Sequence, residues 1–347
     1  MRRILEWYDA LQKVGKMKVC LVGHFADPVD EGVRNVGTNI GKELEHKGIE
    51  VRRIEISSVG EWKSLRAFRP DVIHSVLTPT THGIITVKVV SHIYPRAKTV
   101  LSAVHPSVWR HPLLKCFRPD LTLVQAKESE RSFKSLGFNT RFFPNGVSTN
   151  KFKPIAQRDR QRLRDKFELP AHSFVVLHLA SMQRERNLDI FKTIQEEEDF
   201  QVLIIGRENE RADARLQREL QDAGCLVWIK HFSDIEAVYN LSDCYVFPTL
   251  QSKACIETPL SVLEAMACNL PIVTTRFGAL PRIFVEDNGL FFVDDVDAMP
   301  RILQDIKHRK PPIDTRRLVL SYSWDTLADE LIDMYGQLLR SEDASEE

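Results

Sequence analysis

The chain has 347 residues, of which 43% are hydrophobic and 28% charged, and its formal net charge is zero; this composition excludes an extensively disordered chain and suits two domains of about 150 residues each. No apolar run approaches the roughly 18 residues needed to span a bilayer, and the first residues lack the core of a signal peptide, so we expect a cytoplasmic protein. The six cysteines show no CxxC spacing and lie mostly in apolar runs, which indicates reduced core residues and no metal site: Cys20, Cys116, Cys225, Cys244, Cys255 and Cys268.

Residues 1–16 are predicted to form a short amphipathic helix. Ile4, Tyr8 and Leu11 recur at helical spacing with basic residues around them. Such a helix either packs on the following domain or contacts a membrane surface, and both interpretations remain open.

A β-loop-α-β unit follows. The apolar run from Lys18 to Gly23 predicts a buried parallel strand, and the polar residues from His24 to Val36 predict a loop. Gly37 opens a predicted helix from Ile40 to Lys47, and Val51 to Ile56 is the next strand. A glycine at the helix entrance lets a phosphate or sugar approach the backbone, although it is also compatible with a plain helix start.

Strands and helices continue to alternate up to residue 143. The predicted elements are a helix at 61–68, strands at 71–75, 99–104 and 121–124, a helix at 127–136 and a strand at 140–143. This alternation predicts a doubly wound parallel sheet whose ligand site lies at the C-terminal ends of the strands. His74 and His105 are predicted at two such ends, and Pro106 favours an extended His105 whose imidazole faces the crevice.

The segment from Val72 to Pro119 contains no Asp or Glu. It carries six Lys and Arg residues and five histidines; the former are Lys88, Arg96, Lys98, Arg110, Lys115 and Arg118. An acid-free basic segment favours an anionic partner such as a phosphorylated acceptor or an acidic membrane surface, so peripheral contact with the inner face of the membrane is one interpretation and nucleic acid is not expected. The alternative is a helix surface whose charges are balanced by carboxylates elsewhere.

A second alternation begins after a turn at Pro144 to Val147 and a charged tract at Gln157 to Lys166, where we place the domain junction. Strands are predicted at 174–179, 201–205, 226–229, 244–247, 271–275 and 289–293, with helices at 188–195, 212–223, 235–240 and 260–268 between them. A final amphipathic helix is predicted at 325–339. The predicted domains are therefore residues 1–155, residues 156–322, and a C-terminal helix with an acidic tail at 323–347.

The stretch from Cys255 to Thr275 combines a helix start, two carboxylates and a buried strand. Thr258 is a good N-cap, Pro259 suits the first helical position, and the free N–H groups of the first turn form an anion site. Glu264 lies within an almost wholly apolar helix, where an unpaired charge is costly. Glu264 is therefore either a paired structural residue or a ligand contact.

The order of segments resembles the retaining GT-B glycosyltransferases of family 4. The resemblance covers Lys18 to Leu339 and rests on Pro144-Asn145-Gly146-Val147 with Phe152 and Pro154, on Glu264 to Val273, and on Ser323-Trp324. It implies two Rossmann-like doubly wound α/β domains facing a cleft, a nucleotide-sugar held mainly by the second domain, no metal or other cofactor, and a last helix that returns to the first domain.

The resemblance also implies roles for individual residues. Glu264 would bind the ribose hydroxyls, and the backbone N–H groups around Leu260 and Ser261 would hold the diphosphate. Arg186 takes the place of the family's Lys, Ser181 falls near its Arg position, and Arg184 is an extra candidate. His105 resembles the histidine beside the transferred sugar, and Gly37 lies in the first domain's glycine loop.

The departures concern the first carboxylate. Similar enzymes carry Glu eight residues before the second Glu, but Ile256 stands there and the nearest carboxylate is Glu257, which we assign provisionally to the transferred sugar. The glycines that normally follow are Thr258 and Pro259. Arg282 also stands where relatives often have Glu.

The predicted function is transfer of a hexose from a UDP- or GDP-sugar to an acceptor, with retention of configuration and with His105, Arg186 and Glu257 as the catalytic candidates. The acceptor is predicted to be an anionic or lipid-linked molecule. Two alternatives remain open: a nucleotide-sugar-binding protein that has lost transfer, and a sugar-nucleotide epimerase of the same architecture.

Overall fold

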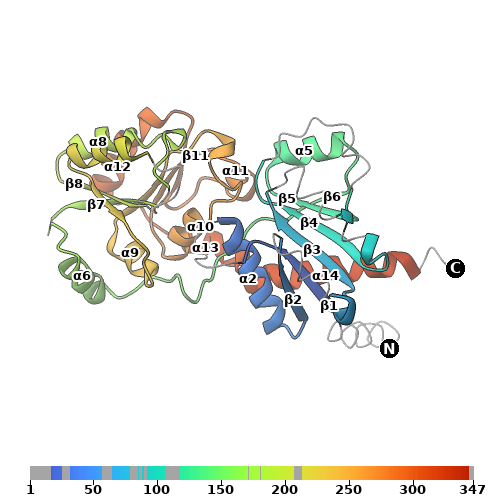
Figure 1. Cartoon of the computed structure of the whole chain (residues 1–347). Coiled ribbons are helices and arrows are strands. Elements are labelled where there is room, and N and C mark those ends of the chain that lie inside the picture. Colours follow the sequence, from blue (N-terminus) through green and yellow to red (C-terminus); the bar gives the residue numbers. More distant parts are fainter. Residues whose placement is uncertain are drawn as a thin grey trace. The chain divides into compact units, whose positions relative to one another are not determined.

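The computed structural model describes residues 17–25, 32–56, 65–78, 85, 88–89, 92–106, 118–170, 172–179, 181–206 and 213–343. The chain divides into two compact units (Figure 1). Unit 1 comprises Met1–Gly146, Ile256–Thr258 and Trp324–Glu347, and unit 2 comprises Val147–Cys255 and Pro259–Ser323. The first boundary lies at Gly146, before the predicted residue 155, and the three residues Ile256–Thr258 belong to unit 1, which was not predicted.

Unit 1 contains a six-stranded parallel sheet in the order β2-β1-β3-β4-β5-β6. Its strands are β1 (Lys18–Gly23), β2 (Glu50–Glu55), β3 (Val72–Leu77), β4 (Lys98–Ala103), β5 (Leu121–Val124) and β6 (Thr140–Phe142), and its helices are α2 (Gly32–His46), α3 (Leu65–Phe68), α5 (Lys127–Ser135) and α14 (Trp324–Asp343). Strands β1, β3, β4 and β5 are buried along almost their whole length, because both faces of a parallel sheet are covered. This double burial explains why the strands read as continuous apolar runs.

Helix α2 begins at Gly32, so the predicted loop from His24 to Val36 is partly wrong. Val33, Val36, Ile40 and Leu44 are buried at helical spacing. Polar residues and glycines separate these apolar residues in the sequence. For that reason only the more apolar second half of the helix was predicted.

His74 lies in the middle of β3, so its predicted place at the C-terminal end of the strand is wrong. It is fully buried; its Nδ1 lies 2.5 Å from the hydroxyl oxygen of Tyr335 on α14, and its Nε2 lies 2.8 Å from Oγ of Ser102 on β4. Burial lowers the pKa of His74 to about 3. A neutral imidazole therefore joins the last helix to the sheet of unit 1.

The turn that was predicted at Pro144 to Val147 contains the boundary between the units. Asn145 is buried; its Nδ2 donates to the Thr258 carbonyl at 2.8 Å, and its Oδ1 accepts from Gln125 at 2.7 Å. A Cβ on Gly146 would lie 2.8 Å from the Trp324 ring, so only glycine fits at this contact. The motif thus fixes where the chain leaves unit 1.

Unit 2 contains a second six-stranded parallel sheet in the order β12-β11-β10-β7-β8-β9. Its strands are β7 (Phe174–Leu179), β8 (Phe200–Gly206), β9 (Leu226–Ile229), β10 (Cys244–Phe247), β11 (Ile272–Thr275) and β12 (Leu290–Val293). Its α-helices are α6 (Gln157–Lys166), α7 (Ile190–Glu196), α8 (Ala214–Asp222), α9 (Ile235–Leu241), α10 (Leu260–Ala267), α11 (Leu280–Ile283), α12 (Met299–Arg309) and α13 (Thr315–Val319). The charged tract that was predicted as the junction is helix α6, inside unit 2.

Alternate residues of the strands in unit 2 face two separate cores. One core joins the sheet to α9 and α10, and the other joins it to α7, α8 and α12. Val175 and Leu177 of β7 face the first core, whereas Val176 between them faces the second. The sheet is therefore covered on both faces, as the alternation of strands and helices predicted.

Several predictions lie outside the described residues: the helix at 1–16, the start of the helices at 61 and 212, and the environments of Cys116, Arg110 and Lys115. None of the five cysteines in the described part forms a disulfide. No described helix combines the length and the apolar character needed to cross a membrane.

Candidate functional site

The candidate site is formed by two loops at the C-terminal edge of the sheet in unit 2. Strands β7 and β10 are adjacent and parallel, so the segments that follow them emerge at the same edge. The loop after β7 carries the 3₁₀ turn η3 (Arg184–Arg186), and the loop after β10 leads to α10.

Helix α10 is capped differently from the prediction. The cap residue is Pro259, with φ −63° and ψ 118°, and no side chain caps the first turn. Thr258 does not cap the helix, and its buried Oγ1 has no hydrogen-bond partner among the described residues. The first N–H groups of a helix have no partner within it. The start of α10 therefore keeps hydrogen-bond donors and the positive end of the helix dipole for an anion.

Glu264 is held by a tyrosine from the neighbouring helix. Oε2 of Glu264 accepts a hydrogen bond of 2.6 Å from the hydroxyl of Tyr239 on α9, while Oε1 makes no hydrogen bond with the described residues. Burial raises the pKa of the Glu264 carboxyl, and the Tyr239 hydrogen bond opposes that rise. One oxygen is thus fixed in place and the other remains for a ligand hydroxyl.

Ser261 lies one turn before Glu264 on the same face of α10. Its Oγ accepts a hydrogen bond of 2.7 Å from Tyr245 on β10. Behind Tyr245, the ring of His178 stacks at 6.2 Å between centroids, and burial lowers the pKa of His178 to about 3. Neither tyrosine was predicted from the sequence, because their partners lie 16 and 25 residues away.

Arg186 lies at this edge without a carboxylate partner among the described residues. Its side chain is half-buried, and its buried Nε has no hydrogen-bond partner in the described part of the chain. The next residue, Asn187, adopts a left-handed conformation and donates to the Pro248 carbonyl at 2.9 Å, just after β10. This contact holds the turn that carries Arg186 beside the end of β10.

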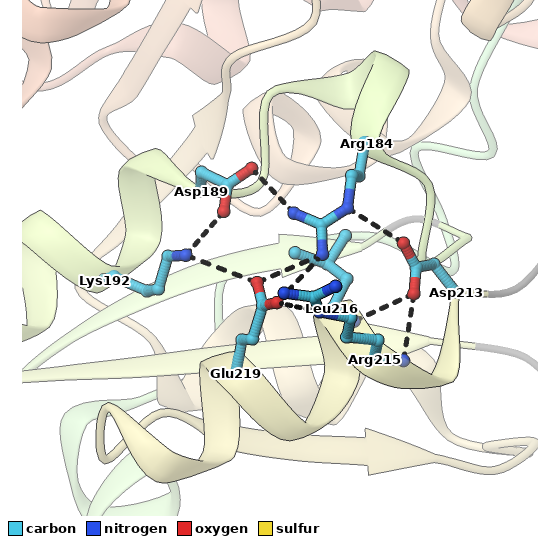
Figure 2. A network of polar contacts seen from close by, with 7 residues as sticks. All are labelled: Arg184, Asp189, Lys192, Asp213, Arg215, Leu216 and Glu219. Atoms are coloured by element: carbon cyan, nitrogen blue, oxygen red, sulfur yellow. Dashed lines mark hydrogen bonds and ion pairs between the residues drawn. The ribbon is translucent and has the colours of Figure 1, made fainter.

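Arg184, in contrast, is already paired. Figure 2 shows its guanidinium between three carboxylates: Nε lies 2.9 Å from Asp213, Nη2 lies 3.1 Å from Glu219 and Nη1 lies 3.5 Å from Asp189. Asp213 also accepts from two backbone N–H groups at the start of α8. Arg184 therefore ties the turn to α8, and the structure does not support it as a diphosphate ligand.

Ser181 lies two residues after the end of β7, in the loop where the sequence placed it, and is half-buried. It carries no charge. Arg186 is thus the cationic candidate in the loop after β7 that has no carboxylate partner among the described residues.

Glu257 is not in this site. It belongs to unit 1, where it is 2% exposed. Its Oε2 accepts from the Ala126 N–H at 2.8 Å and its Oε1 accepts from the Ser129 hydroxyl, so its carboxylate caps the start of α5. Burial raises its pKa, which these hydrogen bonds oppose. The provisional assignment of Glu257 to the transferred sugar is therefore wrong on geometry.

Replacing Glu257 by alanine should destabilise the protein by about 2–3 kcal/mol, because the cap is lost and two buried donors lose their acceptor. Chemical denaturation measures this loss. Glu257→Gln is the matched control, since its amide oxygen still accepts one hydrogen bond, and it should retain more of the stability. An alanine variant with unchanged stability but reduced turnover would instead identify a sugar contact.

Gly37 lies inside α2 and not in a loop. A Cβ there would lie 3.2 Å from the Phe25 ring and 3.6 Å from Val76 of β3, so this glycine allows close packing of the helix. Its predicted role in a glycine loop is not supported.

His105 lies just after β4, at the C-terminal edge of the sheet in unit 1, as predicted from Pro106. It is half-buried and has a partner within the structure. No cluster of three His, Cys, Asp or Glu side chains suited to a metal ion occurs among the residues that the structure describes.

One family model and several curated sequences are similar to the part of the chain that contains this edge. The family model named Glycosyl transferases group 1 matches residues 173–306, which lie in unit 2 except for Ile256–Thr258. A D-inositol 3-phosphate glycosyltransferase from Paenarthrobacter aurescens is 25% identical over 56% of this chain and 50% of its own length. A GDP-mannose-dependent alpha-mannosyltransferase from Mycolicibacterium smegmatis is 23% identical over 90% of this chain and 85% of its own. The chain spans about half the length of the first curated relatives that it matches.

Solved structures show the same two-sheet architecture. Sucrose-phosphate synthase from Thermosynechococcus elongatus superposes with a TM-score of 0.76 at 15% identity, covering 94% of this chain and all of that one. HepE from Anabaena, solved in complex with UDP-glucose, gives a TM-score of 0.66 at 16% identity, covering 95% of this chain and all of that one. At these identities the similarity establishes the fold.

Proposed function

We propose that this chain, which has the GT-B fold and matches the Glycosyl transferases group 1 model over residues 173–306, transfers a hexose from a UDP- or GDP-sugar to an acceptor with retention of configuration. The observation that carries this proposal is that the segments after the adjacent strands β7 and β10 carry three groups without a partner among the described residues. These are the Arg186 guanidinium, the N–H groups at the start of α10 and Oε1 of Glu264.

The three groups match the parts of a nucleotide-sugar. The start of α10 and Arg186 present positive potential to the diphosphate. Glu264 presents a carboxylate oxygen to the ribose hydroxyls, and Tyr239 fixes the direction in which that oxygen points. Tyr245 orients Ser261 in the same way. The GDP-mannose donor named for the Mycolicibacterium relative supports the same class of donor.

The chemical step requires stabilisation of negative charge on the leaving diphosphate as its bond to the hexose breaks. Groups that are already oriented lower that barrier because they need no reorganisation during the reaction. In this proposal Arg186 and the start of α10 supply the potential without a metal ion. His105 is assigned to the transferred sugar from the family resemblance, and Glu257 has no role in the step.

A nucleotide-sugar-binding protein without transfer is the second candidate. The observation that favours it is the position of Glu257, which caps α5 and leaves the sugar end without the family's first carboxylate. A panel of nucleotide-sugars, assayed for hexose transfer and for slow hydrolysis, tests both candidates. Release of free nucleoside diphosphate supports the transferase, binding without release supports the second candidate, and an altered nucleotide-sugar indicates an epimerase.

We further propose that the acceptor lies at an anionic membrane surface. Residues 85, 88–89 and 92–93 are helical, and Ile85, Val89 and Ile93 are 42%, 53% and 45% exposed at a spacing of four. That spacing places the three side chains along one stripe. Lys88 and His92 repeat at the same spacing within the acid-free segment. An apolar stripe beside basic residues is typical of helices that lie on anionic lipid surfaces.

Co-sedimentation at low salt with vesicles of phosphatidylcholine and phosphatidylserine tests the membrane proposal. Replacing Ile85, Val89 and Ile93 together by serine should reduce binding by about tenfold or more, because apolar contact with the lipid is lost. Val285→Ser with Leu320→Ser is the control, since both residues are exposed apolar residues of unit 2. Equal binding of the two variants, or no binding of the wild type, would indicate an acceptor in solution.

A further inference from the structure

A cavity of about 660 Å³ lies in unit 2 at the edge of the sheet opposite the candidate donor site. Phe174 begins β7, Asp243 precedes β10 and Pro271 precedes β11, so the cavity faces the N-terminal ends of these strands. The donor edge lies at their C-terminal ends, roughly 20 Å away along a six-residue strand. The volume of the cavity is within the range of small-molecule sites. The proposed function leaves this cavity without a role.

The walls of the cavity carry excess positive charge. Arg164, Lys307 and Lys310 line it together with His172 and His308, and Asp243 is the one carboxylate among its lining residues. Asp243 is already neutralised, because it forms ion pairs with Arg164 at 3.0 Å and with Arg160, which lies outside the cavity lining. The remaining cations therefore face the cavity without an acidic partner in its walls.

Arg164 is a buried cation with unused donors. It is only 8% exposed; its Nη2 donates to the Ser173 carbonyl and to Asp243, but its buried Nε has no partner among the described residues. A buried donor without an acceptor is costly, and an anion that reached it would remove that cost. Burial lowers the pKa of Arg164, which indicates an environment of low dielectric where ion pairing is strong.

Two lysines at the end of α12, Lys307 and Lys310, also line the cavity. Lys310 has a φ of 44° as the cap of the helix, and its backbone N–H donates to the Ile306 carbonyl at 3.1 Å. Its side chain makes no hydrogen bond or ion pair with the described residues. Lys307 lies 3.2 Å from Asp199 and donates to the Glu198 carbonyl. The other walls are apolar: Phe174, Pro271, Ile306, Pro311 and Ile313. A lining that combines positive charge with apolar surface suits a small organic molecule that carries a phosphate group.

We propose that this cavity is a second anion-binding site of unit 2, which takes the phosphate group of a small phosphomonoester through Arg164, Lys307 and Lys310. The organic part of the ligand packs against Phe174 and Ile306. Because the site lies at the opposite edge of the sheet from the donor edge, its ligand does not occupy the donor site.

Calorimetric titration of the full chain with inorganic phosphate and with glucose 6-phosphate tests this proposal. The test variant combines Lys307→Gln with Lys310→Asn, since asparagine tolerates the left-handed backbone at 310. It should weaken binding by about tenfold or more, because two charge-assisted contacts are lost. Arg309→Gln is the matched control; this residue is on the same turn, pairs with Asp305 and does not line the cavity.

Comparing inorganic phosphate with glucose 6-phosphate shows whether the site binds free phosphate or a phosphate ester. Binding of either probe that falls in the double variant, but not in Arg309→Gln, supports the site. The Arg186→Ala variant should bind the same probe as tightly as the wild type does. The proposal is overturned if neither probe binds at millimolar concentration, if the double variant and its control bind alike, or if Arg186→Ala abolishes the binding, which would assign it to the donor edge.

Discussion

Replacing Arg186 by alanine should reduce turnover by about 10²- to 10³-fold while the fold remains intact. The reason is that Arg186 is the cation of the η3 turn that no described carboxylate neutralises, and loss of one oriented donor at a developing negative charge typically has this effect. Donor hydrolysis or transfer measured by steady-state kinetics, together with the melting temperature, tests the expectation. Near-normal turnover would remove Arg186 from the proposed mechanism.

Arg184→Ala is the matched control for Arg186. The two arginines lie in the same turn, but Arg184 is exposed and paired with Asp189, Asp213 and Glu219 (Figure 2). Its loss should leave most of the turnover, because Lys192 and Arg215 still pair with Glu219. If Arg184→Ala were as damaging as Arg186→Ala, the geometry of the whole turn would matter more than the Arg186 charge.

Stability should fall steeply as the pH is lowered from about 6.5. His74 and His178 have pKa values of about 3 in the folded protein because they are fully buried, whereas an unfolded histidine titrates near 6.5. A lowered folded pKa means that the unfolded chain binds the proton first. The contribution of each neutral histidine to the free energy of unfolding is therefore complete above pH 6.5 and is lost between pH 6.5 and 3. At pH 5 the loss is about 2 kcal/mol per histidine.

Urea denaturation between pH 8 and pH 4.5 measures this loss, and His74→Gln isolates one contribution. The variant should be less stable at neutral pH but should show a flatter dependence on pH. His46→Gln is the control, since His46 is exposed. Buried carboxyls such as Glu257 and Glu264 have raised pKa values and contribute with the opposite sign, so the difference between the variants is the decisive quantity. Equal slopes for His74→Gln and His46→Gln would contradict the account.

The fold was largely predictable from the sequence because its signals are local. Strands β5 and β10 have the predicted bounds, since a doubly covered parallel strand reads as an apolar run of its own length. Helix α2 was predicted too short because glycine and polar residues interrupt its apolar stripe. The unit boundary at Gly146 depends on contacts of Asn145 with Gln125 and Thr258, which no local pattern contains.

The candidate site was predictable only where a residue's role depends on its own segment. The start of α10 and Glu264 were identified correctly as neighbours, because both lie on one helix. Glu257 was misassigned because its partners Ala126 and Ser129 lie well over a hundred residues earlier. Arg184 and Arg186 look alike in sequence, and only the carboxylates around Arg184 distinguish them.

Calorimetry with UDP-, GDP- and ADP-hexoses on the wild type and on Glu264→Ala tests the central claim most directly. The claim is that a nucleotide-sugar binds at the edge of unit 2 formed by η3 and α10. We predict that at least one of these donors binds the wild type and that Glu264→Ala weakens it by about tenfold to a hundredfold, as expected for loss of a charged hydrogen-bond partner. Unchanged affinity in Glu264→Ala, or no binding of any nucleotide-sugar to the wild type, would contradict the claim.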